Sequence, residues 1–237
     1  MKRIGLIGGM SWESTATYYR VINEAVRRQR GGLASADLVL HSLDFTQVVA
    51  LQKADRWSEA GTLLGEAGAG LARIGATCVL ICTNTMHLVA DAVKDMAGVP
   101  LIDIIDETAS ALKHDGKCRP LLLATRYTME HGFYADRMRA HGVDVVVPDE
   151  MDRQAVHDII FDELCRGQIN AGSRDRYLDI IAKASARGVD SVVLGCTEIS
   201  LLLDPHSLSL PGYDSTTIHA EAAVRFALRD QTFDQAA

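Results

Sequence analysis

The stretch Gly188-Val-Asp-Ser-Val-Val-Leu-Gly-Cys196-Thr-Glu198 decides how the rest of this chain is interpreted. It contains an apolar run rich in valine, with a glycine before it and polar residues after it, which is typical of a buried strand in a parallel sheet. Ligands of such sheets bind beyond the carboxyl ends of the strands. The sequence therefore predicts that Cys196 stands at a strand end, where a reactive thiol would meet a ligand.

An earlier stretch has the same construction. Gly75 opens the run Gly-Ala-Thr-Cys-Val-Leu-Ile-Cys-Thr-Asn-Thr, in which Thr83 follows the glycine by eight positions. Cys196 also follows the glycine of its own run by eight positions, so the two residues correspond. Cys82 falls one residue earlier, and one residue along a strand moves a side chain to the opposite face. We therefore predict that Thr83, and not Cys82, is the partner of Cys196.

The rest of the chain alternates between strand and helix patterns. Besides the two strands above, we expect strands at residues 3–8, 36–41, 99–103, 119–125 and 143–148. We expect helices at 11–30, 57–73, 86–96, 106–114, 130–141, 151–167, 173–187, 198–203 and 215–229, a loop or short helix at 44–53, a loop at 205–211 and frayed residues at 230–237. Ser11 and Ser173 are the expected N-caps of their helices.

This alternation is typical of parallel sheets covered by helices. The pattern restarts near residue 119, so we predict an α/β protein made of two similar parallel-sheet lobes. Thr83 and Cys196 end the third strand of each lobe. If a pseudo-twofold axis relates the lobes, both residues line one active-site cleft between them.

Composition narrows the classes of function. The chain has 237 residues, 48% of them hydrophobic and 23% charged, with a net charge of −7 and no long basic run. We therefore expect neither nucleic acid nor a membrane as a partner. The sequence has no apolar stretch of about 18 residues and no signal-peptide pattern, so we expect a cytoplasmic protein.

We also expect no metal and no cofactor. The five cysteines are an odd number without CxxC spacing, and in a reducing compartment they are thiols. His, Cys and carboxylate residues show no metal-ligand spacing. The opening Gly5-x-x-Gly8 does not match a dinucleotide fingerprint and no Walker lysine follows. Its glycines indicate either a tight turn or a close approach of the backbone to a small ligand.

Cys196 itself suggests acid–base chemistry. A thiol at the start of a helix can have a lowered pKa, because the helix N-terminus favours the thiolate, which can act as a general base. The backbone amides of the turns after Thr83 and Cys196 would suit a carboxylate. The alternative is that Cys196 is a buried, inert thiol, since free cysteine is among the most buried residue types. Glu198 either sets the state of Cys196 or caps the following helix.

Three motifs together resemble the aspartate/glutamate racemase superfamily. They are Gly8-Gly9-Met10-Ser11, Thr83-Asn84-Thr85-x-His87 and Gly195-Cys196-Thr197-Glu198. The similarity covers almost the whole chain, and the Gly-Gly-Met opening resembles the aspartate-racemase branch. The resemblance implies a cofactor-independent racemase of aspartate or glutamate that forms a homodimer. It also implies doubly wound lobes, residues 1–98 with 208–237 and residues 99–207.

The resemblance implies roles for particular residues. Family members place one acid/base group on each face of the amino acid α-carbon, which here would be Cys196 and Thr83. The implied substrate-binding residues are Met10, Gln52, Asn84, Thr85, Thr125, Thr197 and Glu198. Asn84, Thr85 and Thr197 would bind the α-carboxylate, largely through backbone amides. Gln52 and Cys165 stand near positions where the family has basic anchors for an acidic side chain, and Lys53, Arg126 or Arg166 could replace those anchors. His87 is either a residue of the site or a plain hydrogen-bonded histidine, and the same holds for His219.

The first motif departs from the family, which has Cys-Asn-Thr where this chain has Thr83-Asn84-Thr85. A hydroxyl has a much higher pKa than a thiol, so it can donate a proton to a carbanion but is a poor base. Cys196 should therefore remove the α-proton and Thr83 should protonate the opposite face. A single cysteine in the second motif also resembles decarboxylases of malonate-type acids, and a small-molecule binding module without turnover is a further alternative.

The absence of cofactor motifs gives a first test. We predict that the protein purified without added cofactor and treated with a chelator keeps its full activity, because its own side chains carry the proton transfers. The measurement is the activity before and after treatment with a metal chelator. Loss of activity that added metal restores would contradict the prediction.

Overall fold

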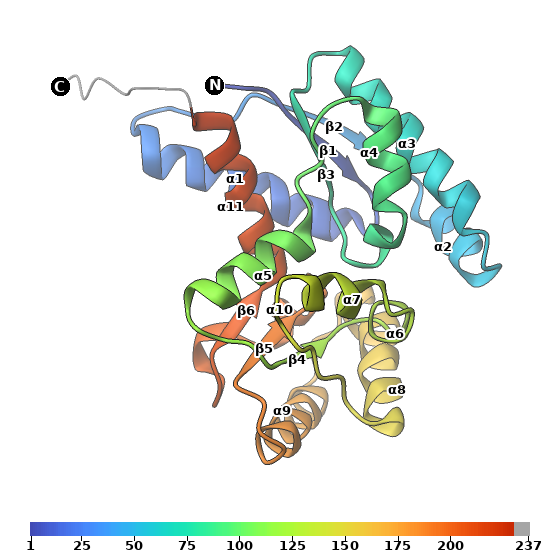
Figure 1. Ribbon diagram of the computed structural model, residues 1–237, viewed down its shortest axis with the longest axis vertical. Helices are drawn as coiled ribbons and strands as arrows, with labels where there is room; N and C mark the ends of the chain where they lie inside the picture. The colour runs from blue at the N-terminus through green and yellow to red at the C-terminus, as the bar shows by residue number, and fades with distance from the viewer. Residues whose placement is uncertain (230–237) are drawn as a thin grey trace. The chain divides into compact units, whose positions relative to one another are not determined.

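The computed structural model describes residues 1–229, so the expectation for residues 230–237 lies outside the described part of the chain (Figure 1). Contacts divide the chain into two compact units. The first unit consists of Met1–Cys82, Val89–Asp103 and the C-terminal residues from His219, and the second of Thr83–Leu88 and Ile104–Ile218. Each unit contains its own parallel sheet and its own core. The predicted α/β class with two parallel-sheet lobes is confirmed.

The first unit is built on a sheet of three parallel strands in the order β2-β1-β3. These are β1 (Ile4–Gly8), β2 (Leu38–Ser42) and β3 (Cys78–Ile81). Its helices are α1 (Trp12–Arg30), α2 (Phe45–Lys53), α3 (Trp57–Arg73), α4 (Ala90–Ala97) and most of α11 (Ser215–Leu228). The strand expected at 99–103 is reduced to one parallel bridge between Leu101 and Val79.

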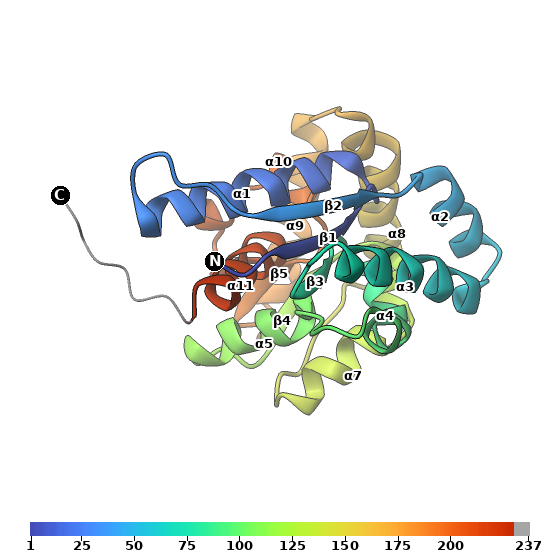
Figure 2. The ribbon, with the colours of Figure 1, turned by 90° about the horizontal axis from the view of Figure 1, so that it is seen from above.

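Helices cover both faces of this sheet. Helices α1 and α11 lie on one face of the sheet (Figure 2), and their buried side chains form one core with Ile4, Leu6 and Leu80. On the opposite face α3 approaches β1 closely, because Gly68 leaves room for Ile7. Successive side chains of the buried strands therefore pack alternately against the helices on the two faces, as expected for a doubly wound sheet.

Helix α1 begins and ends as the sequence predicts. The Ser11 hydroxyl accepts a hydrogen bond from the backbone N–H of Ser14, so Ser11 is the N-cap. Glu13 lies in the first turn and three arginines in the last, where each charge complements the helix dipole. Gly31, with a φ of 73°, ends the helix.

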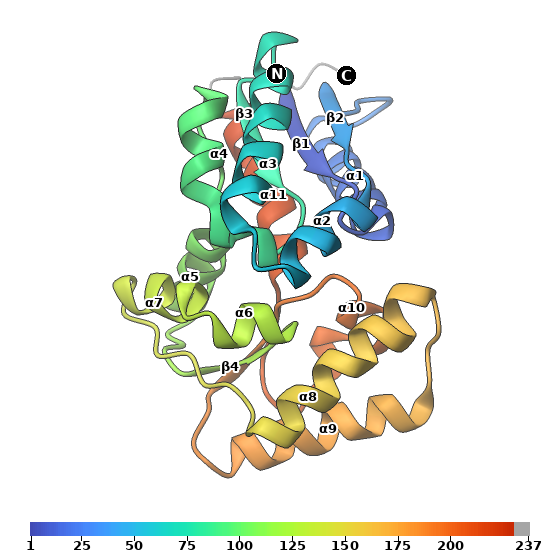
Figure 3. The same cartoon turned by 90° about the vertical axis from the view of Figure 1, so that its right-hand side faces the viewer.

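The second unit has a sheet of three parallel strands in the order β4-β5-β6. These are β4 (Pro120–Leu123), β5 (Ser191–Leu194) and β6 (Gly212–Asp214). Its helices are α5 (Ile104–His114), α6 (Arg126–Glu130), α7 (Phe133–Ala140), α8 (Glu150–Asp158), α9 (Ala171–Ser185) and α10 (Ile199–Leu202). Helices α8 and α9 lie side by side, joined by the buried Asp152, which pairs with Arg176 and Lys183 (Figure 3).

Several predicted elements differ from the structure. The strand expected at 143–148 is only a bridge between Val146 and Leu121. The helix expected at 130–141 begins only at Phe133, as α7, because Gly132 has a φ of 78° that a continuous helix does not allow, and α6 ahead of it was not predicted. The segment 205–211 contains a short 3₁₀ turn, Pro205–Ser207, and the three-residue strand β6 that follows was not predicted.

Three helix boundaries also differ. Helix α9 starts at Ala171 with Asn170 as its N-cap, so Ser173 lies inside the helix and its hydroxyl donates to Glu163. The helix expected at 151–167 continues past α8 as a π-turn, Ile159–Glu163, and a 3₁₀ turn, Leu164–Arg166. The helix expected at 86–96 begins as a 3₁₀ turn, Thr85–Val89, before α4.

The units differ from the expected lobes in three places. Residues 83–88 and 208–218 belong by their contacts to the second unit, and residues 99–103, expected in the second lobe, belong to the first unit. The physical reason is a set of hydrogen bonds and apolar contacts: Asn84 bonds to Ser215, and Leu208, Leu210 and Ile218 pack against the core of the second unit. In the part of the chain that the structure describes, no helix combines the length and apolar character needed to cross a bilayer.

Gly9, which follows β1, should be sensitive to substitution. Gly9 has a φ of 87°, and a Cβ built there would lie 2.2 Å from the carbonyl oxygen of Leu43. Gly32 also has a positive φ of 56°, but a Cβ there would meet nothing within 4 Å. We expect Gly32→Ala to lower the free energy of unfolding by about 1–2 kcal/mol, from backbone strain alone. Gly9→Ala should cost about 1–3 kcal/mol more, because the backbone of Leu43 must move.

The measurement is the denaturant midpoint of both variants beside the parent protein. Equal losses for Gly9→Ala and Gly32→Ala would show that the contact with Leu43 does not constrain the turn.

Candidate active site

Cys196 lies just beyond the end of β5, separated from it by Gly195, as the sequence predicts. All four residues of β5 are buried, and the backbone N–H of Gly195 still donates to the carbonyl of Leu123 at 2.8 Å. A Cβ at Gly195 would lie 2.8 Å from a Leu122 methyl and 3.0 Å from the Ala124 Cβ, so only glycine fits between the strands there. Cys196 is then the first partly exposed side chain beyond the strand.

The environment of Cys196 raises the pKa of its thiol. Removal from water has the largest effect, and the negative charge of Glu198 adds to it. Cys196 Sγ donates a hydrogen bond to Glu198 Oε2 at 2.9 Å, and the Thr197 hydroxyl donates to the same oxygen at 2.9 Å. The expectation that a helix N-terminus lowers this pKa is wrong, because α10 begins only at Ile199 and has four residues.

Thr83 and Cys82 have different surroundings. Cys82 is fully buried in the core of the first unit, where burial raises the pKa of its thiol. Thr83 is partly exposed and begins the segment that contacts assign to the second unit, the unit that also contains Cys196. These environments agree with the register that pairs Thr83 with Cys196.

One hydroxyl connects the Thr83 segment to β5. Asn84 Nδ2 donates to the Ser215 hydroxyl at 3.1 Å, and this hydroxyl donates to the carbonyl of Leu194 at 2.9 Å. Leu194 is the last residue of β5, two positions before Cys196. The buried Asn84 side chain therefore holds the first motif at the strand end that bears the second motif.

The same contacts fix the orientation of the Asn84 amide. The Ser215 hydroxyl has one proton and gives it to Leu194, so it must accept from Asn84, and the amide nitrogen faces Ser215. The Asn84 Oδ1 atom is buried and has no hydrogen-bond partner among the described residues. A buried acceptor of this kind is costly unless a ligand supplies a donor.

Three buried threonines meet at the carboxyl end of β4. The Thr85 hydroxyl lies 2.9 Å from that of Thr125 and 3.0 Å from that of Thr128, and the last two are 3.2 Å apart. Thr125 precedes α6 as its N-cap residue. The predicted residues Thr85 and Thr125 are thus brought together, with Thr128 completing the cluster.

Sequence reasoning missed Thr128 and Ser215. The spacing Thr125-x-x-Thr128 at the start of a helix was the available signal for Thr128. Ser215 was recognised only as the start of the last helix, and nothing in the local sequence indicates a bond to a residue 131 positions away.

The remaining predicted residues are distributed over both units. Met10 and Gln52 are buried residues of the first unit, the former after β1 and the latter within α2, and their role in the site stays a prediction. Cys165 packs against the core of the second unit.

The candidate cations differ in their partners. Arg166 pairs with Asp162, and Lys53 is exposed at the end of α2. Arg126 donates to the neutral Gln154 and forms no ion pair with any residue of the described range. Over residues 1–229, no three or more His, Cys, Asp or Glu side chains are grouped so that they could hold a metal ion.

A family model described as Asp/Glu/Hydantoin racemase matches residues 7–223. The chain therefore belongs to the Asp/Glu/hydantoin racemase family, and this membership supports a racemase, an enzyme of the isomerase class.

Solved structures and curated proteins agree with this assignment. A structure from Yersinia pestis, described as a candidate Asp/Glu racemase, is 49% identical with a TM-score of 0.91 and covers 96% of this chain and 100% of its own. An aspartate racemase homologue from Pyrococcus horikoshii is 32% identical with a TM-score of 0.84, over 96% and 99% of the two chains. The broad specificity amino-acid racemase RacX of Bacillus subtilis is 22% identical over 97% of this chain and 100% of its own. Arylmalonate decarboxylase, at 13% identity and a TM-score of 0.52 over 100% and 97% of the chains, shares the fold alone.

The contact between Cys196 and Glu198 gives a testable prediction. We expect Glu198→Gln to lower the pKa of the Cys196 thiol, because it removes the negative charge next to the thiolate. The measurement is the pH dependence of alkylation of Cys196, followed by peptide mass spectrometry. The exposed Cys118 in the same samples is the internal control. An unchanged or higher midpoint for Cys196 would contradict the prediction.

Proposed function

We propose that this protein is a cofactor-independent racemase of acidic amino acids. Cys196 removes the α-proton from one face of the substrate, and Thr83 returns a proton to the other. The observation that carries the proposal is the chain of hydrogen bonds from Asn84 through Ser215 to Leu194, since it ties the two motifs together within one unit.

The raised pKa of Cys196 suits a demanding base. The α-proton of an amino acid is a very weak acid, and a thiolate of higher pKa is a stronger base towards it. Glu198 Oε2 accepts the hydrogen bond of the Cys196 thiol, so it is placed to accept the thiol proton when the thiolate forms. The ammonium group of a bound amino acid would bring a positive charge that favours the thiolate during the reaction.

The orphaned oxygen of Asn84 favours an amino acid as the substrate. Asn84 Oδ1 is a buried acceptor in the first motif, and an ammonium group is a strong donor for it. A malonate-type acid offers two carboxylates and no ammonium. This contrast supports the racemase over the decarboxylase, although both agree with a single cysteine in the second motif.

The preference for an acidic side chain is supported by the relatives and by one cation. The Yersinia pestis protein and the Pyrococcus horikoshii protein are described by reference to aspartate or glutamate. Arg126, next to the threonine cluster in sequence, forms no ion pair with a carboxylate of the described residues. It is the side chain of this unit that we propose for the distal carboxylate.

Because of Thr83, the proposed racemase should convert the two enantiomers of its substrate at different rates. A hydroxyl can protonate a carbanion but removes an α-proton poorly, so the hand of substrate that presents its proton to Cys196 should react faster per encounter. The equilibrium between the free enantiomers is not altered by the enzyme, and only the rates and affinities for each hand differ.

The two strand-end residues should respond differently to substitution. Cys196→Ala should lower both α-proton exchange and inversion by a factor of about 10²–10⁴ or more, because no other group of suitable pKa starts the reaction. Thr83→Ala should suppress inversion more than exchange, since Cys196 can still remove and return a proton on its own face. The measurement is exchange in deuterated water together with chiral analysis, starting from each hand of aspartate and glutamate.

Two further variants serve as controls for the register of the first motif. Thr83→Cys should raise turnover of the poorer enantiomer, because a second thiol can act as a base. Cys82→Ala should change neither rate much, since that side chain lies in the core. Loss of activity in Cys82→Ala with a silent Thr83→Ala would overturn the assignment. Release of carbon dioxide from a malonate-type acid without exchange on amino acids would favour the decarboxylase, and binding without either reaction would favour a binding module.

A further inference from the structure

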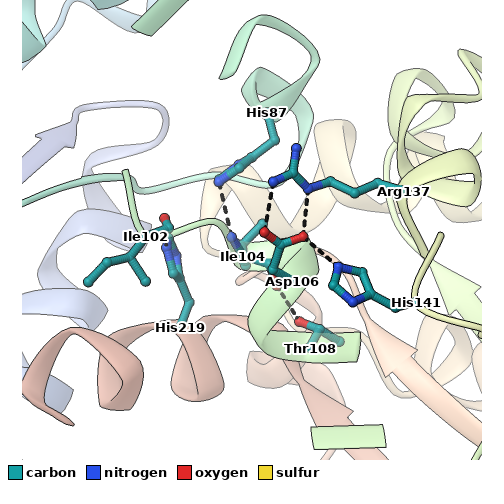
Figure 4. Close-up of polar contacts among 8 residues, drawn as sticks. All are labelled: His87, Ile102, Ile104, Asp106, Thr108, Arg137, His141 and His219. Carbon is teal, nitrogen blue, oxygen red and sulfur yellow. Dashed lines mark hydrogen bonds and ion pairs between the residues drawn. The ribbon is translucent and has the colours of Figure 1, made fainter. Parts of the chain in front are cut away.

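His87 makes two hydrogen bonds that connect the first motif to a helix of the same unit. Its Nδ1 lies 2.8 Å from the carbonyl oxygen of Thr83. Its Nε2 accepts from the backbone N–H of Ile104 at 3.2 Å, a contact drawn in Figure 4. The side chain is buried, with 4% of its surface exposed. We propose that His87 is a positioning residue that fixes the Thr83 backbone for proton return, an inference that rests on the proposed role of Thr83.

The two partners define the tautomer of His87. The backbone N–H of Ile104 can only donate, so Nε2 must be unprotonated to accept from it. The carbonyl of Thr83 can only accept, so Nδ1 must carry the proton. Only the neutral imidazole with its proton on Nδ1 satisfies both contacts. His87 thereby connects the first backbone N–H of α5 to the carbonyl of Thr83.

Hydrogen bonds hold the first turn of α5, which His87 contacts at Ile104, in place. Ile104 is the first residue of α5, and its carbonyl accepts from the Thr108 hydroxyl at 2.7 Å. In the same first turn, Asp106 receives two bonds of 2.7 Å from Arg137 and one of 2.9 Å from His141 (Figure 4). Burial alone would raise the pKa of Asp106, but these bonds hold it below its usual range. The start of α5 is therefore a fixed point against which His87 can hold Thr83.

The bond to the Thr83 carbonyl acts on the peptide between Thr83 and Asn84. Fixing that peptide sets the direction of the Thr83 side chain, and the Asn84 amide is fixed on the other side by Ser215. Proton return to the α-carbon needs the hydroxyl in place to within a fraction of an ångström. Proton removal by Cys196 and return to the same face need no such placement of Thr83. A loosened Thr83 should therefore reduce inversion and spare exchange.

His219 offers a matched control in the first unit. It is also a buried histidine with two short contacts, from Nδ1 to the Tyr18 hydroxyl and from Nε2 to the carbonyl of Ile102, both at 2.7 Å. These bonds hold α11 to Tyr18 of α1 and to the carbonyl of Ile102, all within the first unit, whereas Thr83 and Cys196 belong to the second. Its substitution should lower stability without changing the balance between inversion and exchange.

The experiment compares His87→Asn, His87→Gln and His219→Asn with Thr83→Ala. An asparagine amide nitrogen occupies the place of Nδ1 and keeps the donor to the Thr83 carbonyl, whereas a glutamine amide reaches the place of Nε2. We expect His87→Gln to lower the ratio of inversion to exchange about tenfold, in the direction of Thr83→Ala, with little change in KM. His87→Asn should restore most of the ratio, and His219→Asn should keep the parent ratio.

The outcomes separate the two hypotheses. If Thr83→Ala leaves the ratio unchanged, the proposed role of Thr83 is wrong. If Thr83→Ala lowers the ratio while His87→Gln and His87→Asn both keep it, the role of His87 is overturned. Equal losses of inversion and exchange in the His87 variants, with folding confirmed by circular dichroism, would show a purely structural histidine and also overturn it. Should His87→Gln fail to fold, His87→Ala takes its place as the variant without a donor to the Thr83 carbonyl: a lowered ratio in His87→Ala beside a parent-like ratio in His87→Asn supports the role, and a parent-like ratio in both contradicts it.

Discussion

The candidate site depends on the hydroxyl of Ser215. It accepts from Asn84 and donates to the carbonyl of Leu194, so one buried group joins the first motif to the strand that presents Cys196. Leu194 is the last residue of β5, where the sheet ladder no longer occupies every carbonyl. A buried hydroxyl with both its donor and one acceptor position in use has one favoured orientation, and the Asn84 amide takes its orientation from it.

Several buried polar groups belong to the candidate site around Ser215, and not all of them have a hydrogen-bond partner. The threonine cluster of Thr85, Thr125 and Thr128 satisfies itself, and His87 satisfies the Thr83 carbonyl and the first amide of α5. Asn84 Oδ1 stays without a partner among the described residues. A buried polar atom without a partner lowers stability, so Asn84 Oδ1 is an acceptor that a bound ligand could satisfy.

Electrostatics give the two motifs different character. Burial raises the pKa of the Cys196 thiol and the nearby carboxylate of Glu198 adds to this effect, whereas the first motif offers a hydroxyl and an amide. The site is therefore asymmetric in charge as well as in the residue type at the two strand ends. The residue types are given by the sequence, but the raised pKa of Cys196 depends on tertiary structure, because it comes mainly from burial and includes an electrostatic contribution from Cys165.

Local sequence was enough to predict the strands whose apolar runs are buried on both faces, the bounds of α1 and α3, and the positions of Thr83 and Cys196 beyond their strands. These features follow from local periodicity, glycine and capping residues, which act over a few neighbours. Contacts between distant segments were needed to show that β6 pairs with β5, that 143–148 forms a single bridge, and that residues 83–88 belong with the second unit. The tertiary structure also set the sign of the pKa shift of Cys196 and the bond of Asn84 to Ser215. Short strands gain their stability from a neighbouring strand, and a pKa depends on burial and charge in three dimensions, so neither can be computed from the local sequence.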